Sequence, residues 1–239
     1  MIFADALAWL TDPVNWSGPT SIPARVGVHL LYCLGAVLGA AALAVPLGLY
    51  VGHTGRGGLL VVGGSNALRA LPTLGLVTFL YLVVGVSQLG VLIGLVVLAV
   101  PPILAGTYAG IQSVDHGVVD AARGMGMTGA QRLWKVELPN ALPLLVGGLR
   151  NAVLQVVATA SVAAYVGIES LGRPLIDGLR VLDYGQVIGG AILIALLAVV
   201  VDVLLASAGK LVIPRGLRLT ARPRRRARAG GAVEVGADR

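Results

Sequence analysis

Residues 89–111 read LGVLIGLVVLAVPPILAGTYAGI and contain no charged side chain. Crossing the hydrocarbon core of a bilayer, which is about 30 Å thick, takes about 20 apolar helical residues. In that core only an α-helix or a closed barrel satisfies all of its own backbone hydrogen bonds, and barrel strands alternate apolar and polar residues. Because this run is apolar throughout, it predicts a transmembrane helix.

Further apolar runs place the rest of the chain in the same class. They cover residues 28–51, 59–86, 141–166 and 186–209, and the second is interrupted by Asn66, Arg69 and Pro72. The whole chain is 56% hydrophobic and 12% charged, more apolar than an ordinary soluble domain. The sequence therefore predicts an all-α, multi-pass protein of the plasma or inner membrane. About five transmembrane helices form a domain over residues 28–213.

The distribution of Lys and Arg predicts the orientation, because short cytoplasmic loops hold an excess of these residues. Arg56 falls in one predicted loop, and Arg123, Arg132 and Lys135 fall in another, over residues 112–140. Both loops are then cytoplasmic. The N-terminal segment 1–27 is extracytoplasmic, and the C-terminus lies inside.

An arginine-rich tail over residues 214–239 supplies much of the formal net charge of +7. Such a composition cannot bury apolar surface, and we expect the tail to be disordered. It favours cytoplasmic retention and contact with anionic membrane lipid, and we expect no nucleic-acid partner.

The cytoplasmic segment 112–140 is predicted to form two short helices. Asp115 can cap the first helix and Gly124 can end it. Thr128 and Gln131 have the spacing of a capping box that starts the second helix, which we expect to stop before Pro139. Met125, Gly126 and Met127 would form an apolar turn suited to a partner that repacks. A helical hairpin lying on the lipid headgroups is the alternative.

The same segment carries a recognisable motif. Asp120-Ala121-Ala122-Arg123-Gly124-Met125-Gly126-Met127-Thr128, followed by Val136-Glu137-Leu138-Pro139, resembles the EAA motif of binding-protein-dependent ABC importer permeases. Asp120 stands where the family usually has Glu, and Gly126 falls on the family's glycine. The resemblance implies a type I ABC importer transmembrane fold. It also implies that the coupling loop, which docks on the ATPase subunit, comprises Asp120, Ala121, Ala122, Gly124, Met125, Gly126, Met127 and Thr128.

Further stretches resemble the branch that imports glycine betaine, carnitine and choline. They are residues 66–72, 148–150, 158–160 and 167–172, although Glu169-Ser170 departs from the small residues usual there. The resemblance implies a permease subunit that forms the translocation path for such an osmoprotectant. Its implied partners are an ABC ATPase subunit, a second permease subunit, identical or a paralogue, an extracytoplasmic substrate-binding protein and membrane lipid.

Other motifs are missing from the sequence. It contains no Gly-x-x-x-x-Gly-Lys-Ser/Thr stretch that would cradle a nucleotide phosphate. His29, His53 and His116 are scattered rather than grouped at metal-ligand spacing. We therefore expect a transport subunit that is not an enzyme and holds no metal or cofactor, with ATP and Mg²⁺ bound by the partner ATPase.

Three ionisable residues fall inside the apolar runs: Arg69, Arg150 and Asp202. We expect all three in the cytoplasmic half of the membrane, where an Arg–Asp pair would lock the bundle. Direct substrate contact and, for the arginines, snorkelling to the headgroups are the alternatives. Candidate path residues are Asn66, Thr73, Asn151, Gln155 and Thr159, and the alternative for each is an interhelical hydrogen bond.

Other classes of function remain open at this point. One is an ABC importer permease for another small solute, of the amino-acid type. Another is a stand-alone secondary transporter or channel, although the sequence shows no half-to-half repetition. A membrane enzyme is disfavoured because no catalytic constellation is present.

Overall fold

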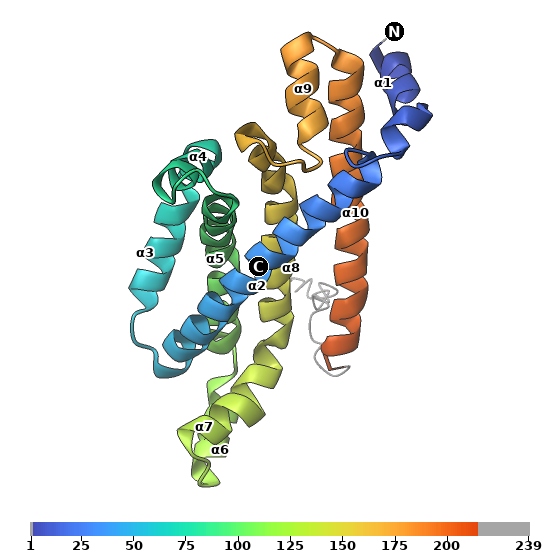
Figure 1. Ribbon diagram of the computed structural model, residues 1–239. Helices are drawn as coiled ribbons and strands as arrows, with labels where there is room; N and C mark the ends of the chain where they lie inside the picture. The colour runs from blue at the N-terminus through green and yellow to red at the C-terminus, as the bar shows by residue number, and fades with distance from the viewer. Residues whose placement is uncertain (1, 215–239) are drawn as a thin grey trace, which may run out of the picture.

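A computed structural model describes residues 2–214 of the chain, and the predicted tail from residue 215 onward lies outside these residues. The described part is helical throughout its regular elements (Figure 1). In chain order these are α1 (Ile2–Thr11), η1 (Pro13–Trp16), α2 (Ile22–Thr54), α3 (Gly58–Arg69), α4 (Thr73–Val83), α5 (Gln88–Gln112), α6 (His116–Gly124), α7 (Gly129–Arg132), η2 (Leu133–Glu137), α8 (Leu138–Thr159), η3 (Ala160–Val166), α9 (Arg173–Val181) and α10 (Tyr184–Val212).

Four helical stretches in the described part are long and apolar enough to cross a membrane: α2, α5, residues 129–166 and α10. The pair α3 and α4 would make a fifth span if counted as one, but the two helices are bent by 92°. The prediction of about five spans is confirmed. The predicted span over residues 59–86 is thus made of two helices and not of one continuous helix.

Pro72 explains the break between α3 and α4. Proline has no backbone N–H and disfavours the helical conformation of the residue before it, here Leu71. α3 therefore ends at Arg69, and α4 begins at Thr73 with Pro72 as its capping residue. The chain changes direction over residues 70–72 instead of continuing as one helix.

α2 begins earlier than the predicted span. Its N-terminus is set by Ser21, whose hydroxyl accepts a hydrogen bond from the Ala24 N–H at 3.4 Å, followed by Pro23 in the first turn. The helix ends where Gly55 adopts a left-handed conformation (φ +69°) and donates its N–H to the Val51 carbonyl. α2 thus includes part of the segment that was expected to lie outside the membrane.

The core lies where α2, α5 and α8 cross, and small residues let these helices approach closely. A Cβ atom at Gly48 would lie 2.7 Å from Cβ of Thr107 on α5, and one at Gly148 would lie 2.7 Å from the Pro102 carbonyl oxygen. Ala36, Ala40, Ala99 and Ala152 are fully buried in the same region. Close van der Waals packing of this kind stabilises helix pairs in lipid, where apolar burial contributes little.

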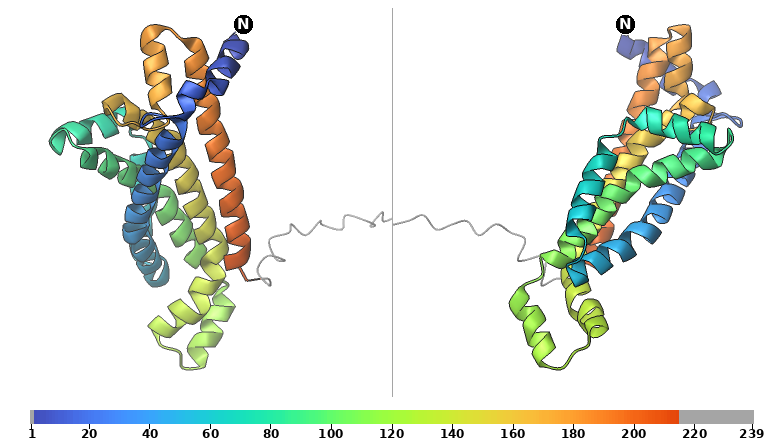
Figure 2. Two further views of the ribbon diagram at one scale, coloured as in Figure 1. Left: turned by 45° about the vertical axis from the view of Figure 1, so that its right-hand side comes forward. Right: turned by 90° about the vertical axis from the view of Figure 1, so that its left-hand side faces the viewer.

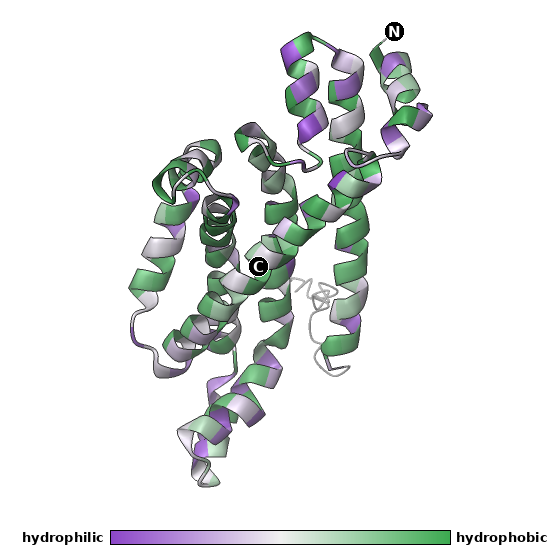
Figure 3. Cartoon of the chain, viewed as in Figure 1, coloured by the Kyte–Doolittle hydropathy of each residue, from purple (hydrophilic) through white to green (hydrophobic). Residues whose placement is uncertain are grey.

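α10 lies at the other side of the molecule, flanked by α1, α8 and α9 (Figure 1). Its Gly189 faces Trp9 of α1, where a Cβ would lie 2.5 Å from the indole ring. Along the middle of α10 the exposed side chains are apolar, among them Val199, Val203 and Leu204. Figure 3 shows hydrophobic residues along the long helices and hydrophilic residues gathered at both ends. This distribution is that of a helix bundle surrounded by lipid.

The two ends of the molecule differ. α6 and α7 project beyond the bundle at one end, and α1 and α9 lie at the opposite end (Figure 2). The last turn of α10 lies at the α6–α7 end. The N-terminal helix and the C-terminal end of α10 are therefore on opposite sides of the bundle, as the predicted topology requires.

Candidate functional site

The segment between α5 and α8 begins as the sequence predicts. The Asp115 carboxylate accepts the Gly117 N–H at 2.7 Å, and α6 runs from there to Gly124. An aspartate at this position satisfies a free backbone N–H and interacts favourably with the helix dipole. Both predicted boundaries of the first short helix are confirmed.

The turn after α6 depends on Gly126. This residue has φ +77°, and its N–H donates to the Arg123 carbonyl at 3.0 Å, while the Met127 N–H reaches the Ala122 carbonyl at 3.2 Å. Gly126 thus closes α6 with a left-handed residue, which glycine adopts at little cost. At the tip, the side chain of Met125 is 72% exposed. A large apolar group is therefore presented beyond the bundle.

The second helix starts as predicted but does not stop before Pro139. The capping box is complete: Gln131 donates its N–H to the Thr128 hydroxyl at 3.3 Å, and Thr128 donates its N–H to the Gln131 side chain at 2.9 Å. α7 then passes through the π-helical turn η2 into α8, so that residues 129–166 are continuous. The wider turn of a π-helix, in which Leu138 donates to the Leu133 carbonyl, accommodates Pro139 without a break.

The other motif residues of α6 divide between two faces. Ala122 is buried, with 2% of its surface exposed, whereas Ala121 is exposed. Asp120 and Arg123 form an exposed ion pair of 3.3 Å. Such an exposed pair contributes little to stability. The charged face of α6 is therefore free to contact another protein.

Where the segment 112–140 joins α5 and α8, it is held against the bundle by packing and by a hydrogen bond. Leu49, Ile111 and Ala141 form a buried apolar cluster from α2, α5 and α8. Beside it, Nδ1–H of His53 donates to Oε2 of Glu137 at 2.6 Å. The sequence does not predict this pair, because the two residues are 84 positions apart and belong to no shared pattern.

Of the three charged residues in the apolar spans, two form an ion pair and the third lies apart from them. Arg150 and Asp202 form a two-point ion pair between α8 and α10, with N–O distances of 2.6 and 2.7 Å. The predicted Arg–Asp pair is thus confirmed for these two residues. Arg69 is exposed in the last turn of α3, at the end remote from the residue 55–57 loop, and makes no ion pair within residues 2–214. Its expected grouping with the other two is wrong.

The candidate path residues also divide. Gln155 donates its side-chain N–H to the Leu98 carbonyl of α5 at 3.1 Å, and the Thr159 hydroxyl donates within α8 to the Gln155 carbonyl at 2.9 Å. These two groups are therefore used in hydrogen bonds of the bundle. Asn66 and Asn151 are exposed and Thr73 is partly exposed, and their side chains make no hydrogen bond within the described part of the chain.

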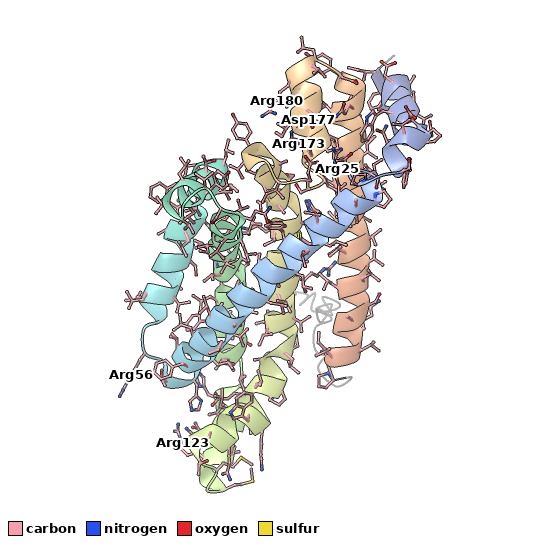
Figure 4. All side chains as sticks on the ribbon, viewed as in Figure 1. Arg25, Arg56, Arg123, Arg173, Asp177 and Arg180 are labelled. Atoms are coloured by element: carbon pink, nitrogen blue, oxygen red, sulfur yellow. The ribbon has the colours of Figure 1, made fainter. Side chains whose placement is uncertain are left out.

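An ion network at the opposite end was not predicted. Arg25 of α2 contacts Glu169 at 3.2 Å, Glu169 contacts Arg173 at 3.6 Å, and Arg173 contacts Asp177 at 2.8 Å. Figure 4 shows Arg173, Asp177 and Arg180 on α9 above Arg25. The network holds α9 and the preceding loop against the start of α2. Charge alternation within residues 169–180 was its only local signal in the sequence.

Comparison with known proteins identifies the family. Residues 44–216 match the model of the family described as "Binding-protein-dependent transport system inner membrane component". The chain belongs to this family. The Listeria monocytogenes carnitine transport permease protein OpuCB is 36% identical to this permease over 203 residues, which cover 85% of this chain and 90% of the relative. The Bacillus subtilis glycine betaine/carnitine/choline transport system permease protein OpuCB is 32% identical over 194 residues, covering 81% and 89%.

A solved structure has the same fold. An inward-facing form of the MetNI methionine ABC transporter has a chain that matches this permease with a TM-score of 0.71 and 22% sequence identity, covering 85% of this chain and 100% of that one. The predicted type I ABC importer fold is confirmed. The protein is a multi-pass inner-membrane transport subunit, and ATP hydrolysis resides in a separate subunit. It works with a substrate-binding protein and an ATPase.

Proposed function

We propose that this permease forms the translocation path for a compact quaternary ammonium compound or zwitterion, such as glycine betaine, choline or carnitine. The observation that carries the proposal is its identity of 32% and 36% with permeases named for these substrates, over more than four fifths of the chain. Relatives from the choline systems, such as the Bacillus subtilis choline transport system permease protein OpuBB, support the same class at 32% identity.

The coupling role falls to residues 112–140. The ATPase subunit, which binds ATP and Mg²⁺, would dock on the projecting α6–α7 tip, where Met125 is exposed between two capped helices. Methionine is suited to a contact that repacks during a cycle because its side chain is flexible and polarisable. The sequence contains no Gly-x-x-x-x-Gly-Lys-Ser/Thr motif.

The positions of the remaining partners are inferred from the two opposite ends of the helix bundle. The substrate-binding protein would approach the end that carries α1 and α9, and a second permease subunit would complete the path within the membrane, with lipid around both. Asn66, Thr73 and Asn151 are the path candidates favoured by the structure, since their side chains are not used in hydrogen bonds of the described bundle. Gln155 and Thr159 would then act mainly in holding α8.

Uptake by the whole complex tests the substrate class. Proteoliposomes containing this permease, its ATPase, its partner permease and its binding protein are expected to accumulate labelled choline, carnitine or glycine betaine when ATP is present inside. Unlabelled compounds of the same class should compete. ATP-dependent uptake of an amino acid that none of these compounds inhibits would overturn the proposed substrate while leaving the family assignment intact.

A further inference from the structure

We propose that His53 and Glu137 form a positioning joint that transmits movement of the coupling segment, residues 112–140, into α2. The inference rests on the coupling role proposed above. It assigns a function to His53, which lies outside the motif that carries the family resemblance, and to the side chain of Glu137, for which that resemblance implies no role. One residue lies in the last turn of α2 and the other at the junction of η2 and α8.

The geometry of the pair is that of a strong hydrogen bond. Nδ1 of His53 lies 2.6 Å from Oε2 of Glu137, and the side chains are only 18% and 7% exposed. A carboxylate that is this well buried loses its hydration, and the imidazole N–H replaces it. The bond therefore fixes the end of α2 to one point on the helix that leads out of the segment.

A second contact fixes α2 to the start of the same segment. Gln112, the last residue of α5, donates its side-chain N–H to the Gly52 carbonyl at 2.8 Å. At Gly52 the helices are in close contact, because a Cβ there would lie 2.7 Å from Cβ of Ile111. Both ends of the coupling segment are thus held against the last turn of α2, from Gln112 on one side and Glu137 on the other.

His53 also lies along the second helix of the segment. A Cβ built on Gly129, the first residue of α7, would lie 3.4 Å from Nε2 of His53. Nε2 of the imidazole thus lies beside the beginning of α7, and Nδ1 bonds to the end of η2. His53 and Glu137 also line a cavity of about 310 Å³, which His116 and Arg123 of α6 border from the other helix.

Movement of the coupling segment can be transmitted only through a stiff connection. On the Glu137 side, a continuous helical stretch supplies this connection. Residues 129–166 are continuous, so a displacement of α7 tilts α8 directly. α2 is a separate helix that packs against α5 and α8 in the core and is fastened to the coupling segment at its last turn. The apolar cluster of Leu49, Ile111 and Ala141 can slide, because apolar contact is non-directional, whereas the hydrogen bond fixes direction and distance.

The test uses the complete transporter reconstituted in proteoliposomes, with ATP hydrolysis and uptake of labelled choline measured together. Removing one partner alone leaves a buried polar group unpaired and can prevent folding. The main variant is therefore the double substitution His53→Leu/Glu137→Leu, which leaves neither group unsatisfied. A second variant exchanges the partners, His53→Glu/Glu137→His, and restores the bond in reverse.

The joint predicts a specific kinetic pattern. The double leucine variant should insert, bind its ATPase and hydrolyse ATP, while choline transported per ATP falls by about five-fold or more. The exchanged pair should recover most of this ratio, which a merely structural fastening would not require. The matched control is Thr54→Val, which removes the neighbouring hydroxyl whose 2.8 Å bond stays within α2, to the Tyr50 carbonyl. Its coupling ratio should match the wild type.

Two outcomes separate this inference from the function on which it rests. A double leucine variant with the wild-type coupling ratio, beside a Gly126→Asp variant that fails to couple, would overturn the joint and leave the coupling segment intact. If both variants couple as the wild type does, the segment itself is not the coupling element and the joint falls with it. Failure of the exchanged pair to recover the ratio, with the protein folded, would also overturn the joint.

Discussion

Gly126 shows how a single residue shapes the coupling segment. Its φ of +77° lies in the left-handed region, where a Cβ costs roughly 1–2 kcal/mol. Gly126→Asp should therefore strain the turn and shift Met125, which is presented beside it. We expect normal membrane insertion, weaker capture of the ATPase subunit and transport that is uncoupled or absent. Pull-down of the ATPase, ATP hydrolysis and uptake by the reconstituted complex measure these effects.

The comparison for this substitution is Gly124→Ala, two positions earlier. Gly124 ends α6 without a positive φ, and nothing lies within 4 Å of the place where its Cβ would stand. An alanine there should leave the turn unchanged. Wild-type ATPase binding and transport by Gly126→Asp would show that this loop does not couple.

Local residue features could be predicted from the sequence, and distant pairings could not. The Asp115 cap and the Thr128–Gln131 capping box each join residues within three positions, so that their spacing alone defines the contact. The His53–Glu137 pair joins different helices. A single sequence shows which charged residues need partners, but the fold decides which partners they find.

The crossing of α5 and α8 decides stability at the scale of elements. A Cβ at Gly148 would lie 2.7 Å from the Pro102 carbonyl oxygen and 2.8 Å from Cα of Gly106. Both are backbone atoms, so the helices would have to separate. Gly148→Val should cost about 1–3 kcal/mol through overpacking. Thermal unfolding of the detergent-solubilised complex, followed through the permease, measures the loss.

Gly147 provides a control on the same helix. Nothing lies within 4 Å of a Cβ built at this position, although it adjoins Gly148 and has the same residue type. Gly147→Val should therefore have a much smaller effect on the unfolding temperature. Equal losses for the two variants would mean that α5 and α8 do not cross as closely as the structure shows.

It was easier to predict which segments form helices than where those helices break. Each long apolar run became helical, the run over residues 59–86 as two helices, because lipid leaves the backbone no other way to satisfy its hydrogen bonds locally. Pro72 and Pro139 then had opposite effects: the chain turns by 92° over residues 70–72 but continues through Pro139 into α8. Pro46, Pro101 and Pro102 also lie inside continuous helices. The neighbouring turn geometry decides between these outcomes, and it is not visible in residue type.

At the scale of the whole molecule, one rigid line connects the coupling tip to the far side of the bundle. α7, η2 and α8 are continuous, and Arg150 of α8 is held to Asp202 of α10 by two hydrogen bonds. α10 in turn contacts α1 and α9 at the opposite end (Figure 1). Force applied at the tip can thus reach the outer helices through α8 and α10 as well as through α2.

The charge at the two ends of the bundle predicts which end faces the cytoplasm. At the α9 end, Arg25 and Arg173 are offset by Glu169 and Asp177. Figure 4 shows Arg56 and Arg123 at the other end. Lys135 of η2 and Lys210 in the last turn of α10 add to the positive charge there. Since cytoplasmic loops hold the excess of Lys and Arg, the α6–α7 tip should lie inside and the N-terminus outside.

Cysteine labelling in intact cells tests this orientation. Val181→Cys in the last turn of α9 is highly exposed (71% for Val181) and should react with a membrane-impermeant maleimide. Ser113→Cys, at the exposed start of the coupling segment, should react only after the cells are permeabilised. The native Cys33 is 4% exposed and serves as the background. Labelling of Ser113→Cys but not of Val181→Cys in intact cells would show that the orientation is the opposite of the predicted one. The coupling segment could then not reach a cytoplasmic ATPase.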